Sequence, residues 1–499
     1  DCTLSCLAGL ADCDGNPANG CETDLTYDVG NCGACGRSCG SANVAQLTCS
    51  AGVCTSGCSS GFGNCNRPAA PAPDDGCEAD LSNDAAHCGS CARPCATTNV
   101  SVAKCSGSIC TSTCAPGFGN CLQSWSPAAD DGCETNTTTA TSHCGACSIA
   151  CTNVGGPTQC TNSLCAPTCY SNAADCDGNP INGCEVITSS DPNNCGRCGR
   201  GCCGGSCSSG ACQPAKLASS ICAGPGVAVD AAYLYCVDYT RGVSRVPFDG
   251  GAAITFAPGS GPQSLALDAN SVAYWLTYSF PNTTNVMKAP GTPSVLASVN
   301  GLPSDIAVGG TYAYWTQTDW PTPGINGWLL RVPVSGGPNE VVATFAANSS
   351  GVGLAIDTNN AYWIVNGATF LAKTPLDAGT STTLAVGMNC QPLVAVDSTS
   401  AYWCLAGTPS TIVRTPLAGG ATTTLAPLAS GIGDLAVDSE GVYWTGTGVA
   451  SPTIMKVPLD GGSAVPLAVG VYQPQSIAVD SACVYWNDGH GDVWRIGKR

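Results

Sequence analysis

The chain has 499 residues, of which 10% are charged and 39 are cysteine. Acidic residues outnumber basic ones, 35 to 17, so the formal net charge at pH 7 is -18. This balance excludes a protein that neutralises nucleic-acid phosphates with Lys and Arg, and it disfavours an anionic membrane surface as a partner. No apolar run approaches the roughly 18 residues of a membrane-spanning helix, so no membrane span is expected.

Cysteine divides the chain into two parts. Between Cys2 and Cys212 lie 34 of the 39 cysteines, which predicts a domain boundary near residue 213. Such a density is typical of secreted or cell-surface proteins, whose small units rely on disulfides where a large apolar core is lacking. We therefore expect an extracellular protein.

The cysteine spacing repeats four times. From Cys54 it is C-x3-C-x6-C-x11-C-x10-C-x2-C-x3-C-x9-C, and the same string begins at Cys110 with its last gap one residue shorter. Two copies with x7 in place of x11 begin at Cys2 and Cys165. The sequence predicts four disulfide-stapled modules in an elongated stalk, at about residues 2–53, 54–109, 110–164 and 165–212.

The C-x2-C-x3-C part of each module has two interpretations. It is compatible with a zinc or iron–sulfur site, but the expected oxidising compartment favours disulfides. Because eight cysteines allow 105 different pairings, no pairs are assigned within the modules.

Acidic and amide side chains recur in one loop of the first and last modules. Oxygen ligands at alternate positions of a Gly-rich loop suit Ca²⁺, although Asx side chains that bond the local backbone explain the same residues equally well. The middle modules have Asn64 and Asn66, or Asn120 and Leu122, and lose the pattern. The calcium candidates are Asp12, Asp14, Asn16 and Glu22, together with Asp175, Asp177, Asn179 and Glu185. No other cofactor is expected.

The same loops carry the string Asp-Cys-Asp-Gly-Asn-Pro-x-Asn-Gly-Cys-Glu at residues 12–22 and 175–185, followed by Asn-Cys-Gly-x-Cys-Gly-Arg. In these residues the modules resemble the cysteine-rich repeat of secreted proteins from myxobacteria and related bacteria. The inserted residues 67–74 and 123–130 depart from the short form of the repeat. The resemblance implies a secreted or cell-surface protein and no particular chemistry.

Beyond residue 213, apolar residues alternate in short runs separated by Gly, Pro and Asn, which predicts many short strands. A unit recurs that contains apolar-Ala-Val-Asp, a turn, Tyr-Trp, a loop, a basic residue near Val-Pro, Gly-Gly and Leu-Ala. Its Asp, or the equivalent position, falls at 230, 268, 309, 357, 397, 438 and 480. This spacing is the period of a propeller blade, so residues 213–499 are predicted to form a seven-bladed β-propeller.

The last unit lacks its fourth strand, and residues 216–219 carry the missing sequence. We therefore expect this segment to close the ring. The unit resembles the YWTD propellers of lipoprotein-receptor type through residues 265–268, 314–316 and 457–461, although that family has six blades. The resemblance implies a binding platform, while similar folds also host enzymes.

Cysteines of the propeller part occupy equivalent positions. Cys222 and Cys236 flank one first strand as Cys390 and Cys404 flank another, so each pair is predicted to form a disulfide within its blade. Cys483 is left over.

Three further cysteines bear on linkage. A bridge from Cys203 or Cys212 to Cys483 would join the modules to the propeller. Because 39 is odd, at least one cysteine is free or intermolecular. If the first cysteine of each module pairs with the preceding module, Cys2 is the candidate intermolecular thiol, and the chain could polymerise into a fibre.

Aromatic side chains suggest where a ligand binds. The Trp of each Tyr-Trp is expected to pack between blades, and the repeated Asp to accept backbone N–H groups. Loops between second and third strands emerge on one face, and those of blades two and three are rich in aromatic residues, although such a Trp can also fold inward. The predicted binding-face aromatics are Tyr278, Phe280, Trp320 and Trp328.

Two functional classes remain. The favoured one is a non-enzymatic structural or adhesive protein whose partner is a protein or glycan at the cell surface, with self-association through Cys2. The alternative is a secreted propeller enzyme acting on glycans or small molecules. The face loops offer only Asp319, Asp434 and Glu440 as acids, and no nucleophile motif is present. Carboxylates with perturbed pKa values inside the channel would favour the enzyme.

Overall fold

The computed structural model describes residues 5–122, 130–259, 261–289, 292–319, 326–346, 352–365, 369–448 and 452–498. Within these ranges every helix or strand element is a β-strand, so the all-β prediction is confirmed. No helix of this part of the chain could cross a membrane. The chain forms two compact units, Asp1–Glu185 and Val186–Arg499, and the second contains the end of the fourth module as well as the propeller.

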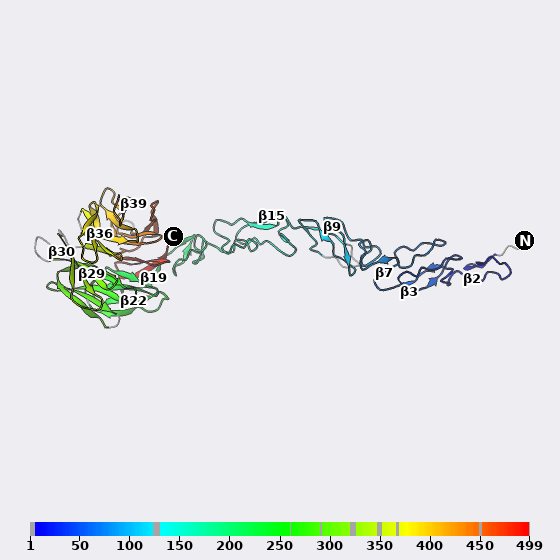
Figure 1. The fold of residues 1–499 in the computed structure, drawn as a ribbon, viewed down its shortest axis with the longest axis horizontal. Helices are drawn as coiled ribbons and strands as arrows, with labels where there is room; N and C mark the ends of the chain where they lie inside the picture. The colour runs from blue at the N-terminus through cyan, green and yellow to red at the C-terminus, as the bar shows by residue number, and fades with distance from the viewer. Residues whose placement is uncertain are drawn as a thin grey trace. The chain divides into compact units, whose positions relative to one another are not determined.

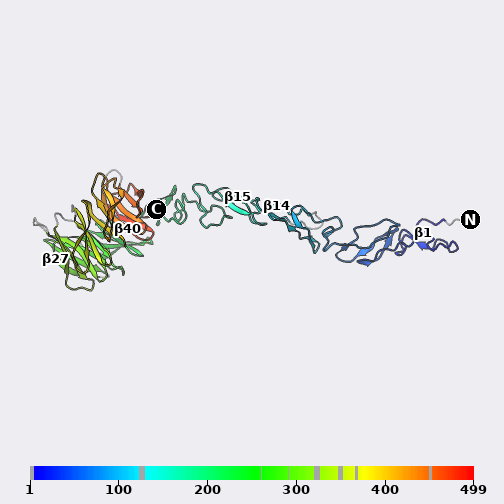
Figure 2. The same cartoon turned by 45° about the horizontal axis from the view of Figure 1, so that its top comes forward.

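Where the structure describes the modules, their strands form only short antiparallel pairs between irregular loops (Figure 2). One kind is β1 (Leu10–Ala11) with β2 (Thr23–Asp24), β7 (Phe62–Gly63) with β8 (Ala79–Asp80), and β13 (Phe118–Gly119) with β14 (Thr135–Asn136). A second kind is β4 (Cys49–Ser50) with β5 (Val53–Cys54), β10 (Cys105–Ser106) with β11 (Ile109–Cys110), β15 (Thr158–Thr161) with β16 (Leu164–Pro167), and β17 (Cys207–Ser208) with β18 (Ala211–Cys212). A third kind is β3 (Val44–Gln46) with β6 (Gly57–Cys58), and β9 (Val100–Val102) with β12 (Thr113–Cys114).

Because these strands are too short to stabilise the modules, disulfides hold the loops together. The eight cysteines from Cys6 to Cys54 pair first with third, second with fifth, fourth with seventh and sixth with eighth. The sets Cys58–Cys110 and Cys114–Cys165 repeat this pattern. The fourth set contributes Cys169–Cys184, Cys195–Cys207 and Cys202–Cys212. Each group of eight cysteines that pair among themselves is called a closed set here. Each closed set begins one cysteine later than the repeat read from the sequence.

The core of a module consists of cystines. In the first closed set the buried cluster is Cys32, Cys39, Cys49 and Cys54, and the second closed set repeats it with Cys88, Cys95, Cys105 and Cys110. These sulfurs are bonded to one another in pairs, so they offer no thiolate to a zinc ion or an iron–sulfur cluster. The structure thus favours the disulfide interpretation of C-x2-C-x3-C.

Seven four-stranded antiparallel sheets form the propeller, which confirms the predicted number of blades. Blade one is β20 (Val227–Val229), β21 (Tyr233–Asp238), β22 (Gly242–Pro247) and β23 (Ile254–Pro258); blade two is β24 (Pro262–Leu267), β25 (Ala273–Ser279), β26 (Thr283–Ala289) and β27 (Ser294–Asn300). Blade three is β28 (Leu302–Gly309), β29 (Tyr312–Thr318), β30 (Asn326–Pro333) and β31 (Glu340–Ala346); blade four is β32 (Val352–Ile356), β33 (Asn360–Val365), β34 (Phe370–Pro375) and β35 (Thr382–Val386). Blade five is β36 (Asn389–Val396), β37 (Ser400–Leu405), β38 (Thr411–Pro416) and β39 (Thr423–Pro427); blade six is β40 (Ile432–Asp438), β41 (Gly441–Gly446), β42 (Thr453–Val457) and β43 (Val465–Val469).

Blade seven is made from both ends of this unit. Its strands are β44 (Ile477–Val479), β45 (Cys483–Asn487), β46 (Val493–Gly497) and, as the fourth, β19 (Ala215–Ala218). Strand β19 pairs antiparallel with β46, and the two lie side by side in Figure 1. The first strands of successive blades are neighbours around the ring, including β44 and β20, so blade seven meets blade one.

The repeated Tyr-Trp and Asp residues hold each blade together. The six Tyr-Trp tryptophans are at most 3% exposed, as expected for side chains packed between sheets. The tyrosine hydroxyl donates to the carboxylate of the repeated Asp in six blades, at 2.7 to 3.3 Å. In blade four the other oxygen of Asp357 accepts the backbone N–H groups of Asn359 and Asn360. These aspartates therefore serve the fold.

Candidate functional site

The first strands surround a channel at the centre of the propeller. A cavity of about 720 Å³ opens there. Its lining includes the residue four places before the repeated Asp in every blade, and these residues are Gly226, Ser264, Asp305, Gly353, Leu393, Asp434 and Ser476. Two of the seven blades thus place a carboxyl group in the channel.

Both carboxyl groups bridge neighbouring blades. Asp305 accepts the N–H of Leu354 on β32 at 3.0 Å and the hydroxyl of Ser264 on β24 at 2.8 Å. Asp434 accepts the N–H of Ile477 on β44 at 2.9 Å. In both residues the Oδ1 atom accepts the N–H of the next residue in its own strand. In Asp305 this same Oδ1 atom accepts the Ser264 hydroxyl. The same bridge therefore occurs at two places in the ring.

Burial changes the acidity of these groups. It raises the pKa of Asp434 to about 7, and the charge of Asp305 acts in the same direction. Burial also raises the pKa of Asp305, against the hydrogen bonds that it accepts. The two residues therefore meet, in part, the condition that would favour acid–base chemistry in the channel.

The stability of the propeller should depend on pH through Asp434. Its pKa is 3.8 when unfolded and about 7 when folded, so the unfolded chain loses this proton first. The contribution of this proton on Asp434 to the free energy of unfolding is complete below about pH 4 and is lost as the pH rises through about 7. Asp434→Ser introduces the residue of blades two and seven. In guanidinium unfolding, we expect its free energy of unfolding relative to the unmodified chain to rise between about pH 4 and pH 8 by a few kcal/mol, at about 1.4 kcal/mol per pKa unit.

The control for this measurement is Asp357→Ser, because hydrogen bonds from Tyr362 and the backbone outweigh burial and lower the pKa of that carboxyl. Its effect should be constant above about pH 5. An unchanged pH dependence in Asp434→Ser would show that Asp434 is ionised across this range in the folded protein.

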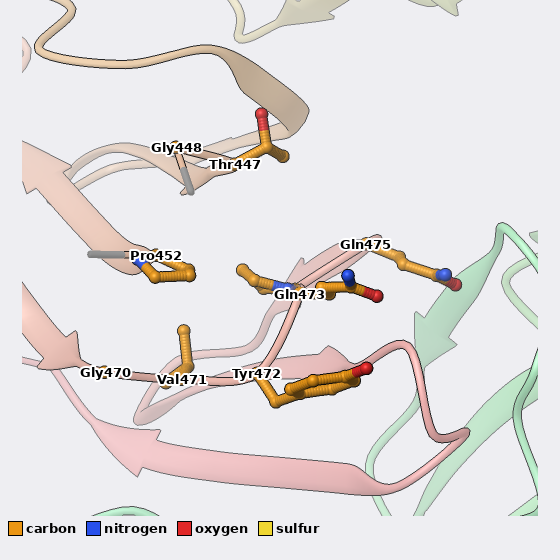
Figure 3. A pocket seen from close by; sticks show the side chains of 9 residues that line it. Thr447, Gly448, Pro452, Gly470, Val471, Tyr472, Gln473 and Gln475 are labelled. Carbon is orange, nitrogen blue, oxygen red and sulfur yellow. The ribbon is translucent and has the colours of Figure 1, made fainter. Parts of the chain in front are cut away.

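A groove of about 570 Å³ adjoins the channel between blades six and seven. Figure 3 shows Thr447 on one side and the segment of residues 470–475, with Tyr472, on the other. Thr447, Pro474 and Gln475 also line the channel cavity. None of the nine residues that line the groove carries a charge, and they are Thr447, Gly448, Pro452, Gly470, Val471, Tyr472, Gln473, Pro474 and Gln475.

The ring of Tyr472 is held in place but accessible. It stacks on the imidazole of His490, with centroids 3.8 Å apart and planes 3° from parallel, while 47% of the residue is exposed. The backbone N–H of His490 in turn donates to Asp488. A fixed aromatic face beside two amide side chains can take a polar ligand that has an apolar surface.

Exposed aromatic residues gather on the face that carries this groove, which we call the channel-mouth face. Loops from second to third strands, and from a fourth strand to the next blade, leave an antiparallel blade at the same end. Tyr239, Phe280 and Tyr472 lie in such loops and are 46%, 91% and 47% exposed. Among the described residues of the propeller, no other Phe, Tyr or Trp residue is exposed.

The aromatic residues predicted to bind a ligand differ in their surroundings. Phe280 projects into solvent, whereas Tyr278 is half-buried and its hydroxyl donates to the carbonyl of Pro281 at 2.9 Å. Trp328 is half-buried against the core cluster around Trp315. Trp320 lies outside the described residues.

The acids predicted on the face loops are placed differently from each other. Asp434 lies within strand β40 and faces the channel, so its assignment to a loop was wrong. Glu440 binds the ammonium group of Lys456 at 2.9 Å. Asp319 donates its N–H to the carbonyl of Asn326. Asp305 was missed, although it breaks the repeat at the same position as Asp434.

The structure also places the predicted calcium ligands. Oxygen atoms of Asp12, Asp14 and Glu22 lie within 4.8 Å of one another. Asn16 is engaged in a turn, where its side-chain oxygen accepts the N–H of Ala18 at 3.2 Å.

The fourth module has similar contacts. Asp175 and Asp177 accept N–H groups of Gly178 and Asn179, Asn179 accepts from Ile181, and Glu185 accepts from Cys176.

The disulfides of the propeller unit include two that span a short stretch of the chain and one that joins distant segments. Cys222 is bonded to Cys236 and Cys390 to Cys404. Cys203 is bonded to Cys483, a separation of 280 residues, while Cys212 pairs with Cys202. Cys2 lies outside the described residues, so its role as an intermolecular thiol stays a prediction.

No family model matches the chain, and no curated protein matches it. Among solved structures, it is similar to a catalytically inactive variant of virginiamycin B lyase from Staphylococcus aureus with quinupristin, at 12% identity over 57% of this chain and 99% of that one, with a TM-score of 0.46. An oligogalacturonate lyase in complex with manganese is 12% identical over 52% and 82% of the two chains, with a TM-score of 0.43. YCF48 from Cyanidioschyzon merolae is 11% identical over 57% and 98%, also at 0.43.

Proposed function

We propose that the chain is an extracellular binding protein whose propeller takes a neutral glycan on the channel-mouth face. The disulfide-rich modules are consistent with an extracellular location, since disulfides persist in oxidising compartments. In this proposal the modules are a structural support.

The observation that carries the proposal is the concentration of exposed aromatic residues on one face, beside an uncharged groove. Tyr472 flanks the groove, whose side-chain polar groups are hydroxyls and amides. Tyr239 lines the channel cavity, which also contains the carboxyl groups of Asp305 and Asp434. Aromatic faces pack on the apolar side of sugar rings, and amides bond their hydroxyls. The net charge of -18 disfavours acidic polysaccharides.

The test is binding of the full chain to a panel of defined neutral and acidic polysaccharides. We expect binding to a neutral member, and a loss of at least tenfold, about 1.4 kcal/mol, in the triple variant Tyr239→Ser, Phe280→Ser and Tyr472→Ser. The control variant Ile254→Ser, Val295→Ser and Val341→Ser removes exposed apolar side chains from fourth strands and should bind normally. Equal losses in both variants, or no binding to any polysaccharide, would contradict the proposal.

The raised pKa of Asp434 supports an enzyme as the second candidate function. A carboxyl group with a pKa of about 7 can donate or accept a proton near neutral pH. The same polysaccharides should then be cleaved or modified, and Asp434→Ser should abolish turnover while binding remains. Binding without product formation favours the first candidate.

A structural role at the cell surface remains part of the proposal. Linkage of chains through Cys2 would give an extracellular fibre that displays many propellers. Multiple copies would raise the avidity for a repetitive glycan without any new contact.

A further inference from the structure

One loop in every module repeats three oxygen-bearing side chains, and this feature is independent of the glycan proposal. The three are the residue before the second cysteine of the closed set, the Asx of Asx-Gly-Cys-Glu, and the Glu itself. The trios are Asp12, Asn19 and Glu22; Asn64, Asp75 and Glu78; Asn120, Asp131 and Glu134; and Asp175, Asn182 and Glu185. Asp and Asn exchange places between modules, so every trio keeps two carboxylates and one amide.

The glutamate is anchored in the same way in all four modules. Its Oε1 atom accepts the backbone N–H of the second cysteine at 2.8 to 3.0 Å. Its Oε2 atom is thereby directed elsewhere. In Glu134 and Glu185 this Oε2 atom is completely buried and accepts no hydrogen bond.

Amide oxygens share this condition. Asn182 donates through Nδ2 to Asp177 at 2.9 Å, which fixes the orientation of the amide, and its Oδ1 atom is buried without a hydrogen-bond partner. The Oδ1 atoms of Asn64 and Asn120 are likewise buried and unpaired. These atoms can only accept, and leaving a buried acceptor unpaired costs about 1–3 kcal/mol.

The first module shows how closely such oxygens approach. Those of Asp12 and Glu22, two members of the first trio, and of the neighbouring Asp14 lie within 4.8 Å of one another. Oxygens on opposite sides of one Ca²⁺ are about 5 Å apart, because each lies about 2.4 Å from the ion.

We propose that each of the four modules binds one Ca²⁺ between the three side chains of its trio. Asp14 and Asp177 would add a further ligand in the first and fourth modules. The all-oxygen ligand set, in irregular loops and without His, suits Ca²⁺ better than Zn²⁺ or the strictly octahedral Mg²⁺. Calcium would satisfy the buried oxygens that the protein itself leaves unpaired.

The sequence alone placed the candidate ligands in the first and last modules only. The proposal adds the Asx of Asx-Gly-Cys-Glu as the third member, and with it the middle modules. The Asn residues that had seemed to break the pattern at 64 and 120 supply buried, unpaired oxygens there.

Calorimetric titration of the chelator-treated full chain with CaCl₂ tests the proposal. We expect about four equivalents bound, one per trio, with dissociation constants in the millimolar to submillimolar range of extracellular sites, and weaker Mg²⁺ binding. Glu185→Gln should remove one equivalent and Glu134→Gln another. The control is Asp191→Asn, which alters a partly buried carboxylate paired with Asn194 in the fourth module and should leave the number unchanged. No uptake at millimolar Ca²⁺ would overturn the proposal and assign the unpaired oxygens to buried water.

The exchange of Asp and Asn offers a second test that does not rest on a loss alone. Asp75→Asn should remove the site of the second module, and Asn64→Asp with Asp75→Asn should restore it in the arrangement of the first module. Disulfide mapping by mass spectrometry checks that both variants keep the native pairs. If the double variant has the native disulfides but does not regain the lost equivalent of bound Ca²⁺, the trios of the first and second modules are not interchangeable.

Discussion

A chain of residues 220–499 is expected not to form a cooperatively folded propeller, whereas a chain of residues 213–499 should do so. Both would carry Cys483→Ser, because both lack Cys203, the partner of Cys483. They differ only in seven residues, which contain β19. The expected loss approaches the whole stability of the domain, on the order of 5–15 kcal/mol.

The physical reason is the position of β19 in blade seven. It pairs with β46, so its removal leaves that strand as a bare edge and the last blade with three strands. Other contacts are lost as well. Lys216 forms an ion pair with Asp492 and lies 4.8 Å from the ring centroid of Trp494. A ring is stable only when its last blade can cover both neighbours.

Circular dichroism and guanidinium unfolding measure the difference between the two chains. The chain 213–499 should show one sharp transition, and the chain 220–499 a broad one or none. A chain that also keeps the last closed set of cysteines, residues 168–499 with Cys483 intact, should be the most stable of the three. Equal transitions in the two shorter chains would show that the ring closes without β19.

The repeated elements were predictable from sequence because their causes are local. The pairing of β24 with β25 and the hydrogen bond of Tyr274 to Asp268 act within one hairpin, so similar residues recur from blade to blade. The seven repeats therefore predicted the seven blades. The burial of Trp275 and its equivalents follows from the same periodicity.

The channel and the groove depend on contacts between blades, which leave no local pattern. The partner of Asp434 is Ile477, 43 residues away, and the partner of Asp305 is Leu354, 49 residues away. Both aspartates do break the repeat at one position, a signal that could have identified them. The stacking of Tyr472 on His490 has no such signal, because it joins two loops whose lengths are not repeated.

The disulfide pattern of the modules could not be predicted from the sequence, because cysteine spacing does not determine which sulfur atoms are bonded. The structure pairs Cys54 with Cys39 and Cys110 with Cys95, so each set closes on the cysteine that the repeat assigns to the next module. The hairpins β4–β5 and β10–β11 place Cys54 opposite Cys49 and Cys110 opposite Cys105, within the buried cysteine cluster of the preceding set.

Removal of the long-range disulfide in Cys203→Ala with Cys483→Ala is expected to lower the free energy of unfolding by about 5 kcal/mol. The bond spans 280 residues, and in the chain-entropy model the stabilisation grows with the logarithm of the span. The matched variant is Cys390→Ala with Cys404→Ala, whose bond spans 14 residues and should contribute about 3 kcal/mol.

Guanidinium unfolding of the full chain, with native pairing checked by mass spectrometry, compares the two variants. Cys203 belongs to the last module and Cys483 begins β45, so the long-range bond holds the segment before β19 against the blade that β19 completes. Its loss should therefore also speed unfolding, because β19 can then leave the edge of blade seven without breaking a covalent link. If the short-span variant were the less stable one, packing around the buried Cys404, and not chain entropy, would dominate the stability of the propeller.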